Sequence, residues 1–542
     1  MTATHEVTNQ VPSLVGHDPI AGDAALAEAC TRHADEATLR SLRDLGELAG
    51  SAQAQEWGRL ANENPPTLRT HDRYGHRVDE VEFHPAWHEL MRTAMQHGLG
   101  GAPWADQDGG DPHAHVRRAV GYLGWTQVEM GHGCPTTMTY AVVPALRGAP
   151  ELAARYEPGL TARAYEFGLT PPAAKSGLVA GMGMTEKQGG SDVRANTTRA
   201  VARPDGSYAL TGHKWFTSAP MGDLFLVLAR LEEGVSCFAV PRVLPDGSRN
   251  VFRLQRLKDK LGDRSNASSE VEFDGTTGWL VGEPGRGVPA IIEMVSTTRL
   301  DCVLGSAATV RAALTQAIHH ARHRRAFGAL LADQPLMQNV LADLAVESEA
   351  ATALGIRLAA AVDAGEAAFL RLAGAAAKYW VCKRTPGVVA EAMEVLGGNG
   401  YVEESGLPRL YRQAPLNSIW EGSGNVIALD VLRALERSSE SLAAVSAEIE
   451  LARGADRRFD DAVKGLSAEL GNRDGLPFRA RRVAGLLALC LQGSLLLRHA
   501  PAAVADAFCA SRLGGEAGTV LGTLPAGTAA AGIVQRSGIV PR

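Results

Sequence analysis

Apolar residues recur at helical spacing over a long part of the N-terminal third of the chain. From Trp87 to about residue 145, positions such as Leu90, Met91 and Met95 follow the spacing of amphipathic helices, and short helices are expected to continue to about residue 172. Residues 1–55 are polar with mixed Gly and Ala. The prolines and the glycine of residues 63–85 indicate a loop.

The pattern changes near Gly181 to short apolar runs separated by turn residues, at 208–211, 224–229, 237–240 and 269–273. The first run is expected to end in a turn at Gly212, and the last to end at Asp274-Gly275. Strands at this spacing predict an antiparallel sheet or barrel over about 181–285.

After Gly287 the helical period returns, over 291–325, 336–364, 366–396 and 425–435. Residues 441–542 add two or three Ala/Leu-rich helices between Gly/Pro-rich turns. The apolar run 483–497 is too short to span a bilayer and predicts a buried helix. The fold class is therefore α+β. We expect an N-terminal extension and helical domain (1–180), a β-domain (181–288), a helical bundle (289–440) and a C-terminal helical domain (441–542).

The composition indicates the cellular compartment and shows that charge is unevenly distributed along the chain. The 542 residues are 45% hydrophobic, enough for a large core. The net charge of −6 argues against a molecule that coats nucleic acid or membrane over its whole surface. Residues 437–542 nevertheless hold 13 Lys+Arg against 10 Asp+Glu, while the remainder carries a net −9. Seven scattered cysteines without a Cys-x-x-Cys spacing, and no secretory signal pattern, indicate a reducing cytoplasm.

Three segments carry the chemistry. Residues 182–192 (Met-Gly-Met-Thr-Glu-Lys-Gln-Gly-Gly-Ser-Asp) offer hydroxyls, glycines and backbone N–H groups suited to a flavin and a phosphate. Residues 417–425 (Asn-Ser-Ile-Trp-Glu-Gly-Ser-Gly-Asn) place a carboxylate beside small residues, which lets backbone approach a flat ligand. Between them lies Gly-His-Lys-Trp-Phe-Thr-Ser at 212–218. Two histidine pairs, His84/His88 and His319/His323, have neither the Glu of a zinc protease nor a third ligand, so no metal site is predicted.

The order helices, β-domain, bundle, together with these segments, resembles the acyl-CoA dehydrogenase family over roughly residues 85–440. The family motifs are Met-Thr-Glu-x-x-x-Gly-Ser-Asp from Met184, Arg-x-x-Phe-Gly from Arg324 (through Arg325 and Phe327), and Gly-Gly-x-Gly-Tyr from Gly397. Further segments, including Phe83-His-Pro-Ala-Trp87 and 257–268, resemble the AidB subfamily of flavoproteins, which belongs to the bacterial response to DNA alkylation. That similarity runs essentially end to end.

The resemblance implies FAD as cofactor, an acyl-CoA ligand, a homotetramer and, through the C-terminal region, non-specific binding of double-stranded DNA dominated by phosphates. It makes Glu421 the base that removes the α-proton of the acyl thioester, while its own backbone N–H polarises the thioester carbonyl. Thr185 and Ser191 would contact substrate. The residues implied to bind cofactor are Met182, Gly183, Met184, Thr185, Glu186, Ser191, Phe216, Thr217, Ser218, Arg324, Phe327, Gly397, Gly398, Trp420, Gly422, Ser423, Gly424 and Asn425.

Each assignment has a structural alternative. Glu421 could cap the helix that starts near Asn425, residues 212–218 could form a hairpin turn with core aromatics, and Gly397 to Gly400 could be a helix C-cap. Arg324, which the resemblance pairs with the FAD pyrophosphate of a neighbouring subunit, could lie on a solvated basic face. Two departures from the family lower the expected acyl-CoA turnover: Lys187 replaces the usual proline, and Thr298 occupies the place of a second possible base.

The basic residues Arg433, Arg479, Arg481 and Arg482 are the candidates for DNA binding, because a guanidinium donates paired hydrogen bonds to phosphate. The alternative is a solvated helix face. Three hypotheses follow. The chain is an AidB-like, DNA-binding FAD protein with weak dehydrogenation of short or branched acyl-CoA, or an ordinary catabolic acyl-CoA dehydrogenase with a structural C-terminal extension, or a DNA-shielding scaffold whose flavin is structural or redox-sensing. Turnover with acyl-CoAs and salt-dependent DNA binding separate them.

Overall fold

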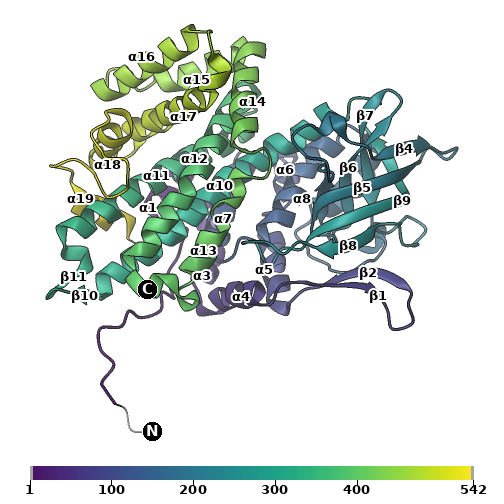
Figure 1. Ribbon diagram of the computed structural model, residues 1–542, viewed down its shortest axis with the longest axis horizontal. Helices are drawn as coiled ribbons and strands as arrows, with labels where there is room; N and C mark the ends of the chain where they lie inside the picture. Colours follow the sequence, from purple (N-terminus) through teal and green to yellow (C-terminus); the bar gives the residue numbers. More distant parts are fainter. Residues whose placement is uncertain (1–3, 539–542) are drawn as a thin grey trace. The chain divides into compact units, whose positions relative to one another are not determined.

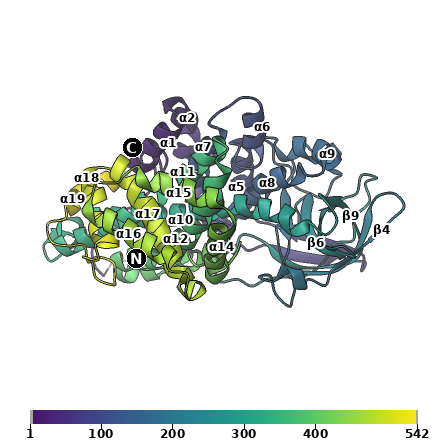
Figure 2. The same ribbon diagram turned by 90° about the horizontal axis from the view of Figure 1, so that it is seen from above.

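A computed structural model describes residues 4–538. The chain divides into two compact units. One unit holds the residues up to 53, 119–127 and those from 302 onward. The other holds 54–118 and 128–301. Figure 1 and Figure 2 show most of the β-strands in the second unit and most of the long helices in the first.

Helices of the second unit confirm the helical prediction as far as residue 160, whereas residues 161–171 contain no helix. These helices are α5 (Pro85–Gln96), α6 (Ala102–Asp108), α8 (Gly133–Leu146) and α9 (Pro150–Leu160). Most of α4 (Ala52–Glu63) and the first turn of α7 (Ala114–Trp125) also belong to this unit. Helix α5 begins where the ring of His84 accepts a hydrogen bond from the N–H of Ala86 at 3.2 Å. Trp87, Leu90 and Met91 then face the core.

The β-domain is a seven-stranded sheet that closes on itself. Strands β6, β4, β5, β9 and β7 pair in that order, and β7 pairs back to β6, while β3 and β8 add to β6 and β9. All pairs are antiparallel except β3 with β6 and β4 with β6. The predicted antiparallel sheet or barrel is thus confirmed, apart from these two parallel pairings. The strands are β3 (Ala180–Gly183), β4 (Arg199–Ala202), β5 (Tyr208–Ser218), β6 (Leu224–Leu231), β7 (Gly234–Pro241), β8 (Arg253–Leu257) and β9 (Ser268–Val281).

Two predicted turns are in fact parts of long strands. Strand β5 continues through Gly212, and β9 continues through Asp274-Gly275. The ladder accommodates them by a register shift between Leu210 and Thr211. Gly212 has φ +149°, and a Cβ there would lie 2.5 Å from Oγ1 of Thr198. The glycine therefore marks a close approach within a strand and not a chain reversal.

The N-terminal part contains elements that the sequence pattern did not predict. Residues 63–85 form the hairpin β1 (Thr67–His71) and β2 (Arg77–Glu82), so the expectation of a loop is wrong. Asp72 stabilises its turn by accepting hydrogen bonds from the N–H groups of Tyr74 and His76. The polar segment before residue 55 forms the short helices α1 (Ala24–His33), α2 (Glu36–Ser41) and α3 (Arg43–Ala49).

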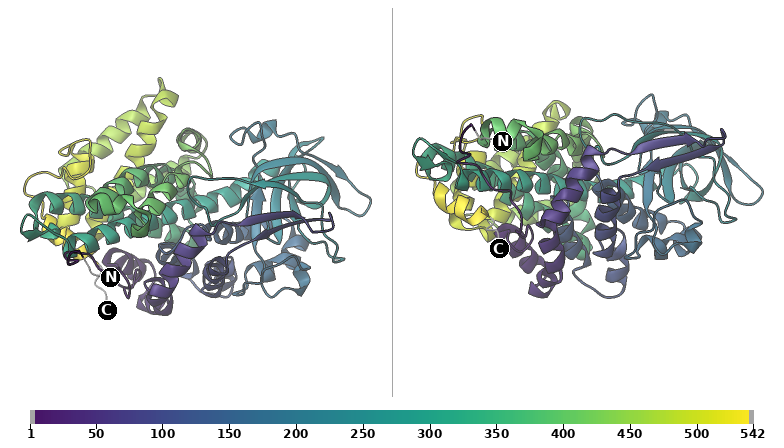
Figure 3. Two further views of the ribbon diagram at one scale, coloured as in Figure 1. Left: turned by 60° about the horizontal axis from the view of Figure 1, so that its bottom comes forward. Right: turned by 90° about the horizontal axis from the view of Figure 1, so that it is seen from below.

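The first unit is built on three long helices at the predicted places, α10 (Gly287–His323, from residue 302), α11 (Pro335–Asp363) and α12 (Ala367–Val395). The further helices are α13 (Leu407–Gln413), α14 (Gly424–Arg437), α15 (Ser439–Glu450), α16 (Arg457–Gly471), α17 (Leu476–His499), α18 (Ala502–Phe508) and α19 (Ala530–Ser537). One core contains Leu314, Val346 and Val389 of the bundle with Phe508 and Val534. Figure 3 shows the C-terminal helices alongside the bundle. Residues 441–538 therefore share its core.

Helix α17 contains the apolar run 483–497. Among the described residues, α17 is the one helix that is long and apolar enough to cross a membrane. The expectation that the apolar run is too short is therefore wrong for the helix as a whole. However, 78% of its apolar window is buried inside the fold, as in the core helix of many soluble proteins. All seven cysteines are buried, and none of them forms a disulfide in the described part of the chain.

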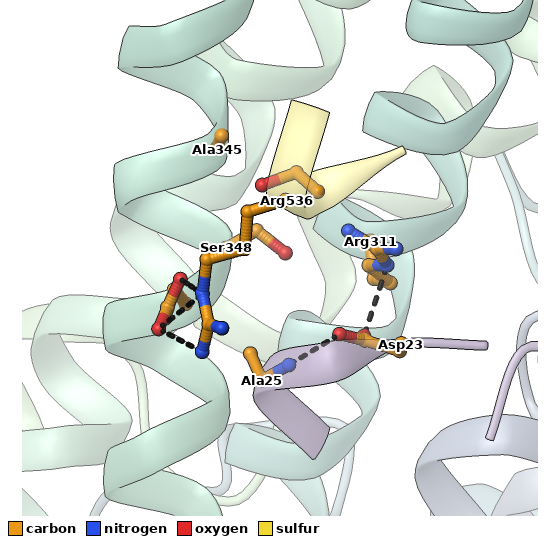
Figure 4. A pocket seen from close by; sticks show the side chains of 8 residues that line it. Asp23, Ala25, Arg311, Ala345, Ser348 and Arg536 are labelled. Atoms are coloured by element: carbon orange, nitrogen blue, oxygen red, sulfur yellow. Dashed lines mark hydrogen bonds and ion pairs between the residues drawn. The ribbon is translucent and has the colours of Figure 1, made fainter. Parts of the chain in front are cut away.

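A network of ion pairs joins α1 to α11 and α19 in the first unit (Figure 4). The guanidinium of Arg536 on α19 contacts both carboxylate oxygens of Glu28 on α1, at 2.8 and 2.6 Å, and Glu349 on α11 at 2.9 Å. Beside it, Arg311 pairs with Asp23 at 2.9 Å, and Asp23 caps α1. The side chains of Asp23, Arg311, Glu349 and Arg536 line a small pocket. We call the contacts of Arg536 with Glu28 and Glu349 the terminal clasp.

Acid should destabilise the fold through buried histidines. Burial lowers the pKa of His115 to about 3 and that of His17 to about 4. Each stays neutral in the folded chain while the unfolded chain takes up a proton near pH 6.5. Stability should therefore fall as the pH drops below about 6.5, by up to roughly 1.4 kcal/mol per pH unit for each group. Urea unfolding midpoints at pH 7, 6 and 5 measure the effect.

His115 allows the contribution of one group to be isolated. Its ring is hydrogen-bonded to Tyr140 at 2.6 Å and to Gln107 at 3.2 Å. The variant His115→Gln should show a shallower decline of the midpoint with falling pH, whatever its absolute stability. Equal slopes for the variant and the unaltered chain would contradict the assignment.

Candidate functional site

In the β-domain, the segment 182–186 lies along strand β5. Met182 and Gly183 belong to β3, and the N–H of Trp215 donates to the carbonyl of Thr185 at 2.8 Å. The N–H of Lys187 donates to the ring of His213 at 2.9 Å. The structure thus brings Met182 to Thr185 together with residues 213–218, two of the predicted cofactor-binding segments. Ser191 lies farther along the same loop and is exposed.

Glu186 is buried beneath this loop rather than on its surface. Its side chain and that of Lys214 are fully buried and pair at 2.8 Å. The carboxylate also accepts from the N–H groups of Thr197 and Thr198 at 2.7 and 3.1 Å. Burial alone would raise the pKa of Glu186, but attraction to Lys214 and these hydrogen bonds lower it well below its usual range. Glu186 therefore anchors the loop that carries Thr185 and Ser191.

Breaking this pair should destabilise the β-domain. In Lys214→Met, Glu186 keeps its backbone donors but loses its countercharge, and we expect a loss of about 3 kcal/mol in the free energy of unfolding. Denaturant unfolding followed by tryptophan fluorescence measures it. Arg40→Met, which removes an exposed ion pair with Glu36, is the control and should cost less than about 1 kcal/mol. Equal costs for the two variants would refute the anchoring role.

Residues Phe216 to Ser218 close strand β5 with different exposures. The ring of Phe216 is 51% exposed, and the ammonium of Lys258 lies 4.7 Å from its centroid. Oγ1 of Thr217 is buried and, within residues 4–538, has no hydrogen-bond partner. Such an orphaned hydroxyl is unusual in a native interior. The hairpin-turn alternative for 212–218 is excluded, because these residues continue one strand.

The motif of Phe83 and Trp87 lies elsewhere in the same unit. The two rings stack at 4.0 Å, and Phe167 packs edge-on against Phe83 at 6.0 Å. Together with Met221 and Asp223 they line a small pocket. Burial raises the pKa of Asp223 to about 6.

In the helical unit, Glu421 lies in a tight turn that precedes α14. It has φ +56°, the left-handed region that non-glycine residues seldom adopt, and Gly422 follows with φ +102°. Lys378 of α12, only 1% exposed, donates from Nζ to the carbonyl oxygen of Trp420 at 2.8 Å and to that of Gly422. The residues on both sides of Glu421 are therefore held by one buried ammonium.

The same turn is held from a second side. The indole Nε1 of Trp420 donates to Oδ1 of Asn417 at 2.8 Å, and Nδ2 of Asn417 donates to the hydroxyl of Ser306 on α10 at 3.2 Å. Helix α14 has Ser423 as its N-cap residue, without a side-chain capping bond. Glu421, two residues earlier, is therefore not the N-cap residue of this helix.

Two basic side chains, those of Lys383 and Arg481, lie beside the first turn of α14. A Cβ added to Gly424 would come within 2.6 Å of Cε of Lys383 and 3.4 Å of Nη2 of Arg481. Arg481 also donates from Nε to Oδ1 of Asn425 at 2.8 Å. The sequence pattern assigns Arg481 to DNA and does not identify Lys378 or Lys383, because nothing in a run of helical residues marks which lysine faces a turn about 40 positions later.

The predicted cofactor contacts Arg324 and Phe327 lie at a short hairpin that follows α10. Arg325–Ala326 and Ala329–Leu330 form the two-residue strands β10 and β11, and Phe327 and Gly328 are the turn between them, with φ +53° and +83°. Phe327 is 99% exposed. Arg324 donates to the carbonyl of Asn9 at 2.5 Å. In Figure 1 this hairpin lies at the other end of the helical unit from the start of α14. Within one chain, Arg324 and Phe327 therefore do not meet Glu421.

Gly397 and Gly398 lie in a 3-10 turn, Gly397–Tyr401, that follows α12. Gly397 has φ +59°, as expected of a glycine that ends a helix. No side chain or backbone lies within 4 Å of a Cβ built on either residue. The helix C-cap alternative thus describes the local geometry, and open space in front of both glycines leaves room for a ligand.

The four DNA candidates differ in their surroundings. Arg433 is exposed on α14. Arg479 is bound internally, to the carboxylate of Glu469 and to the carbonyls of Asn472 and Asp474. Arg482 shares Glu469 at 2.7 Å but is 69% exposed. The accessible guanidinium groups are thus those of Arg433, Arg481 and Arg482.

Among residues 4–538 no group of three or more His, Cys, Asp or Glu side chains could hold a metal ion. The histidine pairs have other partners. His84 caps α5, and His319 donates to the carbonyl of Pro12 at 2.8 Å.

Comparison with known proteins places these features in a family. Residues 9–167 match the adaptive response protein AidB N-terminal domain, 181–276 match the acyl-CoA dehydrogenase middle domain, and 285–436 match the acyl-CoA dehydrogenase C-terminal domain. The chain is 47% identical to the AidB protein of Escherichia coli over 511 residues, covering 93% of this chain and 94% of that protein.

Solved structures agree in fold. ACDH-11 of Caenorhabditis elegans, in complex with C11-CoA, superposes with a TM-score of 0.84 at 26% identity and covers 94% of both chains. An acyl-CoA dehydrogenase of Bacillus anthracis, complexed with FAD, gives a TM-score of 0.65 at 19% identity over 79% of this chain and 81% of that one. With the AidB-type N-terminal domain, both dehydrogenase domains and this identity over nearly its whole length, the chain belongs to the AidB-like branch of the acyl-CoA dehydrogenase family.

Proposed function

We propose that this chain is an FAD-dependent oxidoreductase of acyl-CoA dehydrogenase type, in which Glu421 removes the α-proton of an acyl thioester. The observation that carries the proposal is the turn at Glu421. A carboxylate is held there in a rare backbone conformation by contacts to two helices. Strain of this kind persists only where the surroundings determine it, and it is concentrated at functional sites.

FAD is the cofactor of this family, and the residues present fit it. In the β-domain, the half-exposed ring of Phe216 offers a face to an aromatic ring system, and the orphaned hydroxyl of Thr217 lacks only a polar partner. In the helical unit, Lys383, Arg481 and the first turn of α14 provide positive charge and a helix N-terminus, which suit the anionic part of a dinucleotide. When bound, the flavin supplies the acceptor for the hydride that leaves the β-carbon.

The protein residues provide the acid–base chemistry. The carboxylate of Glu421 accepts the α-proton, which is only weakly acidic beside a thioester, so the base must lie within hydrogen-bond reach. The N–H of Glu421 donates to the thioester oxygen on which the enolate charge develops. Gly422, with φ +102°, allows the chain to pass close to a ligand because it has no Cβ.

We propose an acyl-CoA as the ligand. ACDH-11, which was solved with C11-CoA, matches nearly the whole length of this chain. Lys187 and the doubled glycine at 189–190 lie in the exposed part of the 182–192 loop, and we expect them to reduce turnover relative to the catabolic members of the family.

The test is spectroscopic. The purified protein should be yellow and show a flavin spectrum, and the visible band should bleach when an acyl-CoA is added without oxygen. A panel of straight and branched acyl-CoAs ranks the ligands. A protein that stays colourless in the presence of added FAD would refute the proposal.

We further propose that the C-terminal region binds double-stranded DNA through its phosphates. Arg433 and Arg437 of α14 are both exposed, are four residues apart on one helix face and make no ion pair within the described chain. Arg482 adds a third accessible guanidinium. Such a surface suits phosphates without sequence preference.

Charge reversal at this surface should weaken DNA binding. Because Arg433→Glu/Arg437→Glu no longer neutralises two phosphates, the slope of log K against log salt should become less steep by about 1.8. Fluorescence anisotropy with a duplex at several salt concentrations measures this. Arg457→Glu/Arg453→Glu, two exposed arginines near the start of α16, matches the change in net charge. Equal effects in both double variants would indicate a general charge effect and exclude this surface.

A further inference from the structure

Lys378 is a buried charge that the proposed chemistry does not yet use. It lies in the middle of α12, is 1% exposed and, within residues 4–538, contacts backbone carbonyls and no carboxylate. Its ammonium donates to the carbonyl oxygens of Trp420 and Gly422. A buried ammonium is costly unless it is hydrogen-bonded, so its retention at this position requires an explanation.

The geometry of the peptide bond gives one. In a trans peptide, the C=O and the N–H point in opposite directions. No described peptide bond is cis, and the carbonyl of Trp420 is directed at Nζ of Lys378, 2.8 Å away. The N–H of the same peptide unit belongs to Glu421 and must therefore point away from Lys378. This N–H is the group that donates to the thioester oxygen in the proposed reaction.

The second contact fixes the carboxylate. Because the carbonyls before and after Glu421 are bound by the same ammonium, the backbone of Glu421 is fixed on both sides in its left-handed conformation. That conformation costs roughly 1–2 kcal/mol for a non-glycine residue. A fixed backbone sets the direction of the Cα–Cβ bond, and it thereby limits the region that the carboxylate can reach.

The contact also changes the strength of the donor. A positive charge on the carbonyl side polarises the peptide unit, and hydrogen bonds in a chain strengthen one another. The N–H of Glu421 thereby becomes a better donor to a developing oxyanion than an ordinary amide.

We propose that Lys378 is a positioning residue, which directs both the carboxylate and the backbone N–H of Glu421 toward the acyl thioester and polarises that N–H. The proposal rests on Glu421 being the base. In this role Lys378 touches neither substrate nor cofactor. It acts through the peptide unit between Trp420 and Glu421 and through the backbone on either side of Glu421.

The test compares Lys378→Met, which keeps the shape of the side chain but removes the charge and the donors, with Lys378→Arg, which keeps both. In Lys378→Met, kcat for an acyl-CoA should fall about 10- to 100-fold with KM nearly unchanged, somewhat less than the loss of a direct oxyanion donor. The acid limb of the kcat profile should move to higher pH, because a nearby positive charge that favours the carboxylate is gone. Lys378→Arg should recover most of the loss.

A binding measurement provides a readout other than turnover. Acetoacetyl-CoA has an acidic α-carbon and presents an enolate oxygen, whereas CoA alone does not. Calorimetry should show that Lys378→Met binds acetoacetyl-CoA about tenfold more weakly and CoA as well as the unaltered protein does.

The outcomes separate the two proposals. If Glu421→Gln turns over like the unaltered protein, Glu421 is not the base and both proposals fail. If Glu421→Gln is inactive but Lys378→Met keeps the normal kcat and pH profile, only the role of Lys378 fails. A purely structural role predicts that acetoacetyl-CoA and CoA lose affinity equally. Should Lys378→Met not fold, Lys378→Arg decides: normal turnover with an unshifted pH profile supports the proposal, and loss of turnover in a stably folded Lys378→Arg overturns it.

Discussion

Replacing Glu421 by glutamine should reduce kcat for acyl-CoA dehydrogenation by about 10² to 10⁴, the range for a positioned general base. The amide keeps the size of the side chain, and the carbonyls of Trp420 and Gly422 remain bound by Lys378. KM should change little, since the base acts on the proton and not on the CoA part of the ligand. Steady-state turnover with an electron-accepting dye measures both constants.

Glu436→Gln is the matched control, because it removes an exposed carboxylate from the same helical segment. It should keep the turnover of the unaltered protein, and both variants should retain their flavin spectrum. An active Glu421→Gln protein would assign the proton transfer to another group. A variant that loses its flavin would instead place Glu421 in cofactor binding.

Arg118→Met should destabilise the second unit by about 3 to 5 kcal/mol, the cost of leaving a buried charge without its partner. Arg118 on α7 and Asp301 on α10 are each 1% exposed and form a bidentate pair, with distances of 2.5 and 2.6 Å. Arg118 also donates to the carbonyl of Leu99 at 2.9 Å, and Thr137 donates to Asp301 at 2.6 Å. The expected result is a large shift of the denaturant midpoint.

The double variant Arg118→Met/Asp301→Asn distinguishes the charge effect from reduced packing. Asparagine still accepts from Thr137 but carries no charge, so the double variant should recover part of the loss. The single variant Asp301→Asn completes the comparison. If the loss in the double variant equals the sum of the losses in the two single variants, the pair is not coupled.

The strongly periodic parts of the chain could be predicted from sequence. The helices at 291–325, 336–364 and 366–396 appear within a few residues of the predicted bounds, because long amphipathic patterns admit one interpretation. The hairpin at 67–82 could not be, since its strands are short and largely exposed and the prolines before it imitate a loop. At Gly212 the error was the opposite one, because a turn was predicted where the structure has a continuous strand. The glycine is required by the approach of Thr198, a contact from elsewhere in the sheet that local sequence does not encode.

The candidate site was predictable only where a motif marks it. Family motifs led to Glu421 and to residues 182–191, but the structure assigns Glu186 of that motif to an internal ion pair with Lys214. Only the tertiary contacts reveal that Lys378 and Lys383 lie at this site. The DNA candidates divide for the same reason: only the folded chain shows that the donors of Arg479 are already occupied by Glu469 and two carbonyls.

The terminal clasp has a consequence for how the chain is made. Arg536 contacts Glu28, a residue synthesised 508 positions earlier. Helix α1 therefore lacks one of its partners until residue 536 has left the ribosome, while the intervening β-domain can already form its closed sheet. A ribosome stalled before residue 536 should display a nascent chain whose β-domain resists protease and whose first helices are still cleaved.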